Sequence, residues 1–142
     1  MIWFVKPELE ALNRLHVNTA PEHIGIEFTE VGDDYLVATM PVDHRHVQPY
    51  RTLHGGVSAV MAETMGSVGA SLCVDSSKYI CMGLEINANH IRPAREGDGH
   101  VIGRATPIHI GRTTQVWEIR ITNQAGKLVC ISRLTVAVRE IG

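Results

Sequence analysis

The chain has 142 residues, of which 44% are hydrophobic and 20% charged, and its formal net charge is −2. This length and composition predict one ordinary globular domain covering residues 1–142. So small a net charge gives no reason to expect nucleic acid or an anionic membrane as a partner. No run of about 18 apolar residues predicts a membrane-spanning helix, and the apolar start MIWFV is too short for a secretory signal.

The first third of the chain predicts a short helix followed by a β-hairpin. Pro7 opens a helical pattern that ends near His16, with acidic residues in its first turn and basic residues near its end, as the helix dipole favours. Two β-rich runs follow between residues 24 and 42, and Gly32-Asp33-Asp34 joins them as a hairpin turn. A polar connection over residues 43–52 leads to the next element.

Residues 55–74 predict one long helix. The stretch is rich in Ala, Met and Ser, contains no Pro and shows no strict alternation of apolar and polar residues. Its four glycines would make a lone helix marginal, so we expect neighbouring elements to pack on several of its sides.

The remainder predicts four strands, at residues 79–94, 100–110, 113–124 and 128–141, with a turn at residues 125–127 before the last. Too few helices are left for a parallel sheet. We therefore predict an α+β fold in which an antiparallel sheet wraps around one apolar helix.

The three cysteines, Cys73, Cys81 and Cys130, are odd in number and form no CxxC pair. This argues against a disulfide framework or a zinc site. Scattered thiols in apolar surroundings are typical of core residues in a reducing compartment, so we expect a cytoplasmic protein.

Glu63 is the only fully charged residue between Leu53 and Val74. Apolar neighbours surround it in the sequence, namely Val60, Met61, Met65 and Val68. A carboxylate in such a setting is expected to be partly desolvated, which would raise its pKa and make it a better base near neutral pH. Alternatively, Glu63 simply reaches solvent or pairs with an arginine.

His54-Gly55-Gly56 precedes the predicted helix. Glycines at a helix start leave backbone N–H groups unpaired, and the dipole there favours negative charge, which suits an oxyanion. An ordinary loop-to-helix glycine pair is the alternative interpretation. Ser67, one turn after Glu63 on the same face, could orient a water molecule or could be only a small residue at a crossing.

Other catalytic patterns are weak or missing. His44 and His46 could form a metal pair, but no Glu or Cys with ligand spacing accompanies them. No GxSxG motif supports a serine triad, and no phosphate-binding or dinucleotide glycine loop is present. We therefore expect neither a metal nor a cofactor.

Several motifs, in order along nearly the whole chain, resemble those of the hotdog-fold acyl-CoA thioesterases. They are MIW, GDDYLVATMPVD, QPxxxLHGG, AETMGS, GLEINANHIRP, IHIGR, QVWEI and SRLT. Within that PaaI-like group the chain is most similar to the bacterial branch that hydrolyses 1,4-dihydroxy-2-naphthoyl-CoA in menaquinone biosynthesis and to its enterobactin-proofreading relative. It departs from the branch at Tyr50-Arg51, where Phe-Gly is usual, and this change could alter the acyl preference.

The resemblance implies roles for five residues. Glu63 would be the general base for water or a nucleophile that forms a transient anhydride. The Gly55 N–H would hold the thioester carbonyl with His54 close by, and Gln48 would reach the reacting group across a dimer interface. Ser67 would position the water or the substrate.

It also implies a groove for the nucleotide and pantetheine of coenzyme A. Gly83 would allow the ligand to approach closely, and Arg92 and Arg112 would contact phosphates. The lining residues would be His90, Ile91, Arg92, Pro93, His109, Ile110, Gly111, Arg112, Thr113 and Thr114. Taken alone, these histidines and arginines could equally be structural or surface residues, although alternation would put His90 and Arg92 on one strand face.

The sequence thus predicts a hotdog thioesterase that hydrolyses an aromatic acyl-CoA, with 1,4-dihydroxy-2-naphthoyl-CoA as the best specific guess. An exposed sheet edge and a small-residue helix favour a homodimer with shared active sites, and the resemblance adds a dimer-of-dimers tetramer. Two alternatives remain: a broad aryl or fatty acyl thioesterase acting on carrier-protein thioesters, and a non-catalytic acyl-CoA binding module. The sequence argues against a hotdog dehydratase, because that reaction requires an Asp/His pair and the helix supplies only Glu63.

Overall fold

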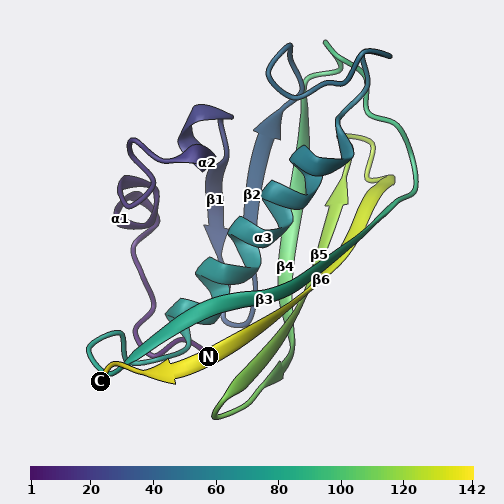
Figure 1. The fold of residues 1–142 in the computed structure, drawn as a ribbon. Helices are drawn as coiled ribbons and strands as arrows, with labels where there is room; N and C mark the ends of the chain where they lie inside the picture. Colours follow the sequence, from purple (N-terminus) through teal and green to yellow (C-terminus); the bar gives the residue numbers. More distant parts are fainter.

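The computed structural model describes residues 1–142 and shows a six-stranded antiparallel sheet curved around one long helix (Figure 1). The strands lie in the order β1-β2-β4-β5-β6-β3. Their bounds are β1 Glu27–Val31, β2 Leu36–Pro41, β3 Tyr79–His90, β4 His100–Ile110, β5 Thr114–Thr122 and β6 Leu128–Glu140, and the helices are α1 Leu9–Arg14, α2 Ala20–His23 and α3 Gly55–Leu72. The predicted α+β arrangement is confirmed.

The long helix α3 lies close to the sheet because its inner face is made of small or flexible residues. That face consists of Ser58, Met61, Ala62, Met65, Gly66, Gly69 and Ala70, all buried. A Cβ atom on Gly66 would lie 2.7 Å from Leu134 of β6, and one on Gly69 would lie 2.8 Å from the ring of Trp117 of β5. The glycines that weaken the isolated helix are therefore what allow it to pack.

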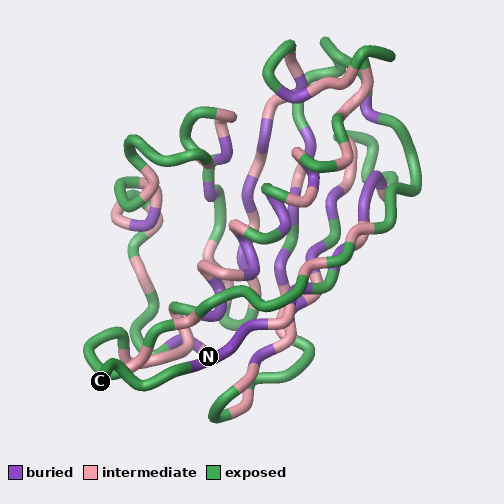
Figure 2. Tube along the Cα trace, viewed as in Figure 1, coloured by how far each residue is buried: buried purple, intermediate pink, exposed green.

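The core fills the space between α3 and the concave face of the sheet, where buried residues alternate along β2 and β5, whereas β6 also has runs of consecutive buried residues (Figure 2). The N-terminal segment joins this core through Trp3, whose ring stacks on Trp117 with 6.2 Å between centroids. The indole N–H of Trp3 donates to the Gly32 carbonyl at 2.6 Å. Residues 1–5 are thereby anchored beside the C-terminal end of α3.

Besides shifts of one or two residues at the ends of elements, two details differ from the sequence prediction. β3 ends at His90 instead of continuing to residue 94, because the N–H groups of Ile91 and Arg92 both turn to the Val129 carbonyl and Pro93 has no N–H to continue the ladder. The helix α2 was not predicted, since four residues show no periodicity.

Strand β3 forms one end of the sheet, so one edge of its twelve residues has no strand partner within the chain. Three large apolar side chains on this strand are exposed, Ile80 at 50%, Met82 at 57% and Leu84 at 62%. A long apolar edge of this kind is a template for pairing with another strand.

The three cysteines are free. Burial raises the pKa of the Cys73 thiol to about 12 and also raises the pKa of the Cys81 and Cys130 thiols. Their role as packed residues agrees with the sequence prediction. None of the helices combines the length and the apolar character needed to cross a bilayer.

Candidate functional site

The start of α3 presents one unpaired backbone donor. His54 caps the helix, since its Nδ1 accepts from the Gly56 N–H at 2.9 Å and its carbonyl accepts from Val57 and Ser58. The Gly55 N–H has no acceptor in the chain. It points out of the positive end of an 18-residue helix, which makes it suited to binding a polarised carbonyl oxygen.

A cavity of about 340 Å³ lies against this donor. It is lined by Gln48, Thr52, Leu53, Gly55, Ser58, His90, Ile91, Arg92, Pro93 and Val129. Six of these were predicted as site residues, and they come from the loop before α3 and from the end of β3. The fold therefore brings together residues that lie about 40 positions apart in the sequence.

His90 and Arg92 reach this cavity in different ways. A Cβ atom on Gly55 would lie 2.7 Å from Nε2 of His90, so the imidazole lies over the start of α3 and a larger residue at position 55 would displace the ring. Arg92 lies beyond the end of β3 and donates from Nη1 to the Leu128 carbonyl at 2.7 Å. The prediction that the two share a strand face is therefore wrong, although both line the cavity.

Gln48 is half-buried in the loop before α3. Its Nε2 donates to Oγ1 of Thr52 at 2.8 Å, and its Oε1 accepts from the Tyr50 N–H at 2.6 Å. Both ends of the amide are thus held inside its own loop, which fixes the side chain at the wall of the cavity.

Glu63 lies on the exposed face of α3, so its own chain does not provide the apolar surroundings that were expected to desolvate it partly. Met61 and Met65 are two positions away on either side, which on a helix is the opposite face, and both are fully buried in the core. The alternative of an ion pair with an arginine is not realised either, since no cation of the chain pairs with Glu63. Its carboxylate leans over β3, where a Cβ atom on Gly83 would lie 2.7 Å from Oε1.

Glu63 and the Gly55 cavity are separate within one chain. Glu63 follows Gly55 by eight residues, which is about 12 Å along the helix axis, and it does not line the cavity. One chain therefore does not place the carboxylate beside Gly55 and Gln48.

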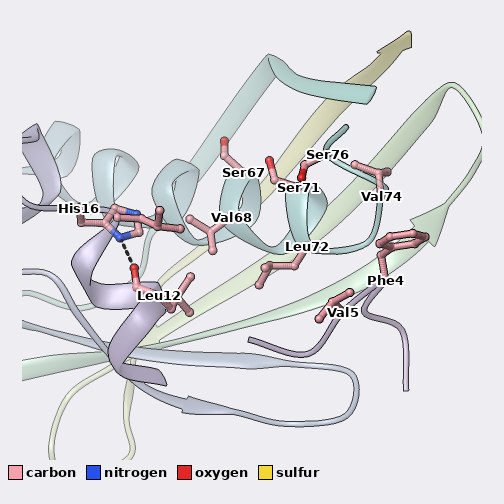
Figure 3. A pocket seen from close by; sticks show the side chains of 11 residues that line it. Phe4, Val5, Leu12, His16, Ser67, Val68, Ser71, Leu72, Val74 and Ser76 are labelled. Carbon is pink, nitrogen blue, oxygen red and sulfur yellow. Dashed lines mark hydrogen bonds between the residues drawn. The ribbon is translucent and has the colours of Figure 1, made fainter. Parts of the chain in front are cut away.

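A second cavity, of about 530 Å³, lies along the C-terminal part of α3 (Figure 3). Its walls are α3, the α1 region and the N-terminal segment, and most of its lining is apolar: Phe4, Val5, Leu12, Leu15, His16, Ser67, Val68, Ser71, Leu72, Val74 and Ser76. Ser67, one turn after Glu63, is the only predicted site residue among them. Sequence reasoning missed the rest because an apolar side chain at a cavity is indistinguishable in sequence from one in the core.

The remaining predicted groove residues lie at the other end of α3. Ile110, Gly111 and Arg112 border a cavity of about 380 Å³ together with Cys73 and Tyr79. Beside them, His109 packs on Gly111, the Thr113 carbonyl accepts from Val138, and Thr114 begins β5 opposite Ala137. Apart from Gly83, which lies beside Glu63, the predicted substrate residues thus form two groups at opposite ends of the helix.

The histidines of the loop at residues 43–46 are not arranged as a metal pair. His44 is exposed and His46 is fully buried, and no group of three or more His, Cys, Asp or Glu side chains is placed to hold a metal ion.

Comparisons with known proteins agree on one family. The model of the thioesterase superfamily matches residues 50–130. The chain is 49% identical to 1,4-dihydroxy-2-naphthoyl-CoA hydrolase of Escherichia coli, and the match covers 97% of this chain and 98% of that one. It is 48% identical to proofreading thioesterase EntH of Cronobacter turicensis, over 97% and 98% of the two chains. Among solved structures, a glutamine-to-alanine variant of a Pseudomonas aeruginosa thioesterase superposes with a TM-score of 0.95 at 48% identity, covering 99% of this chain and all of that one.

Proposed function

Because this chain belongs to the thioesterase superfamily and is a thioester hydrolase with the hotdog fold, we propose that it cleaves an aromatic acyl-CoA to free acid and coenzyme A. The observation that carries the proposal is that α3 presents two groups suited to thioester hydrolysis. They are the Gly55 N–H, which has no acceptor in the chain, and the exposed carboxylate of Glu63 about 12 Å further along the helix axis, which has no cationic partner in the chain. The relative from E. coli supports 1,4-dihydroxy-2-naphthoyl-CoA, a menaquinone precursor, as the specific substrate.

The chemistry needs only these groups and water. The thioester carbonyl oxygen accepts from the Gly55 N–H, which stabilises the negative charge that develops on it during attack. Glu63 removes a proton from the attacking water and returns it to the departing thiolate of coenzyme A when the C–S bond breaks. In the alternative route, the carboxylate attacks the carbonyl directly and water hydrolyses the resulting anhydride. Neither route requires a metal or a cofactor.

A second copy of the chain would complete the site. Helix α3 runs antiparallel to β3, because His90 lies beside Gly55 and Gly83 lies beside Glu63. A twofold axis that pairs the free edges of two β3 strands makes those strands antiparallel, so it turns the Gly55 end of one chain toward the later part of α3 in the other. We propose a homodimer in which Gln48, His54 and Gly55 of one chain face Glu63 and Ser67 of the other. The resemblance extends this to a dimer-of-dimers tetramer.

We assign the acyl group to the cavity that Ser67, one turn after Glu63, lines on α3. Its apolar lining suits an aromatic ring, and the hydroxyls of Ser67, Ser71 and Ser76 offer partners for ring hydroxyl groups (Figure 3). Arg92 and Arg112, at opposite ends of α3 in one chain, come toward each other from two chains of the proposed dimer and would contact the phosphates of coenzyme A. A coenzyme A substrate agrees with the cytoplasmic location that the free cysteines predict.

The test is steady-state hydrolysis of an acyl-CoA panel by the wild type, Glu63→Gln and a control, Glu27→Gln, which changes an exposed carboxylate on β1. The panel holds benzoyl, hydroxyphenylacetyl, 1-hydroxy-2-naphthoyl, hexanoyl and palmitoyl thioesters. We expect the aryl thioesters to be preferred and Glu63→Gln to lower kcat at least about 10²-fold with little change in KM, while the control keeps full activity.

The outcomes separate the alternatives. Preference for hexanoyl or palmitoyl thioesters, or much faster hydrolysis when the same acyl group is on a carrier protein, would replace the aryl-CoA assignment by a broad thioesterase. Binding without turnover in the wild type would identify an acyl-CoA binding module. Equal rates for the wild type and Glu63→Gln would refute the role of the carboxylate.

A further inference from the structure

One histidine of the chain is completely buried, and the chemistry above does not use it. His46, in the connection between β2 and α3, is 0% exposed. Its Nε2 lies 2.6 Å from the Ile24 carbonyl, which can only accept, so Nε2 carries a proton and donates. Its Nδ1 accepts from the Asp43 N–H at 3.0 Å, and an Asp43 carboxylate oxygen lies 3.1 Å from the same nitrogen.

The contacts of His46 tie the loop to α2. Ile24 is the C-terminal cap of that helix, and Arg45, adjacent to His46, donates to the His23 carbonyl at 2.8 Å while its guanidinium holds both oxygens of Asp43. These bonds keep the pKa of the Asp43 carboxyl well below its usual range. The loop over residues 43–46 is therefore fixed to a neighbouring element through both side chains and backbone.

The same residue also holds the start of α3. The His46 carbonyl accepts from the His54 N–H at 2.8 Å, and the adjoining Val47 and Leu53 form an isolated β-bridge. The peptide that follows His54 carries the unpaired Gly55 N–H. An unbroken path of hydrogen bonds thus runs from the Ile24 carbonyl through the imidazole and backbone of His46 to the peptide next to Gly55.

We propose that His46 is a positioning residue that sets the direction of the Gly55 N–H. The catalytic task of that N–H rests on the proposed function. Its positioning by His46 is a property of the fold alone. Removing the ring would leave the Ile24 carbonyl and the Asp43 N–H without their imidazole partner at a partly buried position. The loop would then rearrange, and the donor would move with the His54 peptide.

Activity is one readout. A displacement of about 1 Å at a catalytic donor can cost on the order of 10²-fold in rate, so we expect His46→Ala to lower kcat by about 10- to 100-fold with KM changed less than about threefold. His46→Gln can still donate to the Ile24 carbonyl from its amide and should recover part of the loss. Ile121→Val, which removes a core methylene on β5, is the control for lost stability and should keep kcat.

The position of the donor is the second readout, and it is independent of turnover. In protein labelled with [15N]glycine, the Gly55 amide resonance should shift or broaden in His46→Ala, return toward its wild-type position in His46→Gln, and stay unchanged in Ile121→Val. A Gly55 resonance that does not move in His46→Ala overturns the inference whatever the activity. Full kcat in His46→Ala, or an equal loss in Ile121→Val, overturns it as well, whereas failure of the proposed function shows separately as no turnover by the wild type or as an active Glu63→Gln.

Discussion

At the scale of single residues, Arg51 occupies a backbone conformation that side chains rarely adopt. Its φ is +63°, a left-handed conformation that costs a non-glycine residue about 1–2 kcal/mol. The guanidinium compensates by donating to both carboxylate oxygens of Glu96 at 2.7 Å, and the Glu96 N–H donates to the Arg51 carbonyl at 3.0 Å. This geometry gives a physical reason for the glycine that the resembling branch usually has here.

Comparing Arg51→Gly with Arg51→Ala separates the strain from the ion pair. Both variants lose the bond to Glu96, which as a largely exposed pair contributes at most about 1 kcal/mol. Only glycine relieves the left-handed backbone, so we expect Arg51→Gly to be more stable than Arg51→Ala by about 1 kcal/mol in urea unfolding. Equal unfolding free energies for the two variants would show that the loop relaxes without cost.

The contacts of Tyr50 and Arg51, where the chain departs from the resembling branch, show which of the two is available for binding. The charge of Arg51 is directed to Glu96, whereas Tyr50 is 89% exposed. Of the two residues, Tyr50 is therefore the one available to a substrate or a second chain.

For Glu63, the sequence predicted the position on a helix but not the environment of the side chain. That Glu63 lies on a helix, and that Ser67 follows it on the same face, could be predicted from the spacing. The apolar neighbours misled, because two of them, Met61 and Met65, lie on the opposite face of that helix. Within the chain, Val60 and Gly83 adjoin Glu63. The rest of its surroundings depends on what packs against the exposed face of α3, and no local sequence pattern encodes that contact.

At the scale of elements, the packing of α3 on the sheet depends on close approach more than on helix propensity. Replacing a helical glycine by alanine usually stabilises a helix by about 1 kcal/mol. On Gly69 the added methyl would lie 2.8 Å from the Trp117 ring, which Trp3 and the Gln115 side chain hold in place. Because the Trp117 ring cannot move aside easily, we expect the clash with it to outweigh the gain in helix propensity.

We expect Gly69→Ala to lower the free energy of unfolding by about 1–3 kcal/mol through overpacking. Thr64→Ala, away from the sheet on the same helix, serves as the control and should stay within about 0.5 kcal/mol of the wild type. Thermal and urea unfolding measure both. A stabilised Gly69→Ala would mean that Trp117 moves aside and that propensity dominates.

Elements were predictable where burial imposes a period. The bounds of β4, His100–Ile110, coincide with the predicted strand, and α3 begins where predicted and ends two residues early. Prediction failed where the cause is tertiary: β3 stops at His90 because the next two N–H groups turn to Val129, and α2 is held by Arg45 and His46 from a distant loop. None of these four hydrogen bonds leaves a local pattern in the sequence.

At the scale of the whole molecule, the predicted site residues divide between the two ends of one helix. Gln48, His90 and Arg92 lie with Gly55 at its start, while Glu63, Ser67 and the β4–β5 turn at Gly111 lie along its middle and at its end. In the homodimer proposed above, a twofold axis would bring the two halves together, and the free edge of β3 is the surface on which we expect the two chains to pair.

Mixing two inactive variants tests this division. Gln48→Ala damages one half of the proposed site and Glu63→Gln the other, so each homodimer has two defective sites. In a mixed dimer, one site combines the intact Gln48 of one chain with the intact Glu63 of the other, and the second site carries both changes. Random reassociation after mild denaturation makes half of the dimers mixed, so we expect about one quarter of wild-type activity per chain. If both residues serve the same site within one chain, no mixing ratio restores activity above the sum of the separate variants, and the shared-site dimer is wrong.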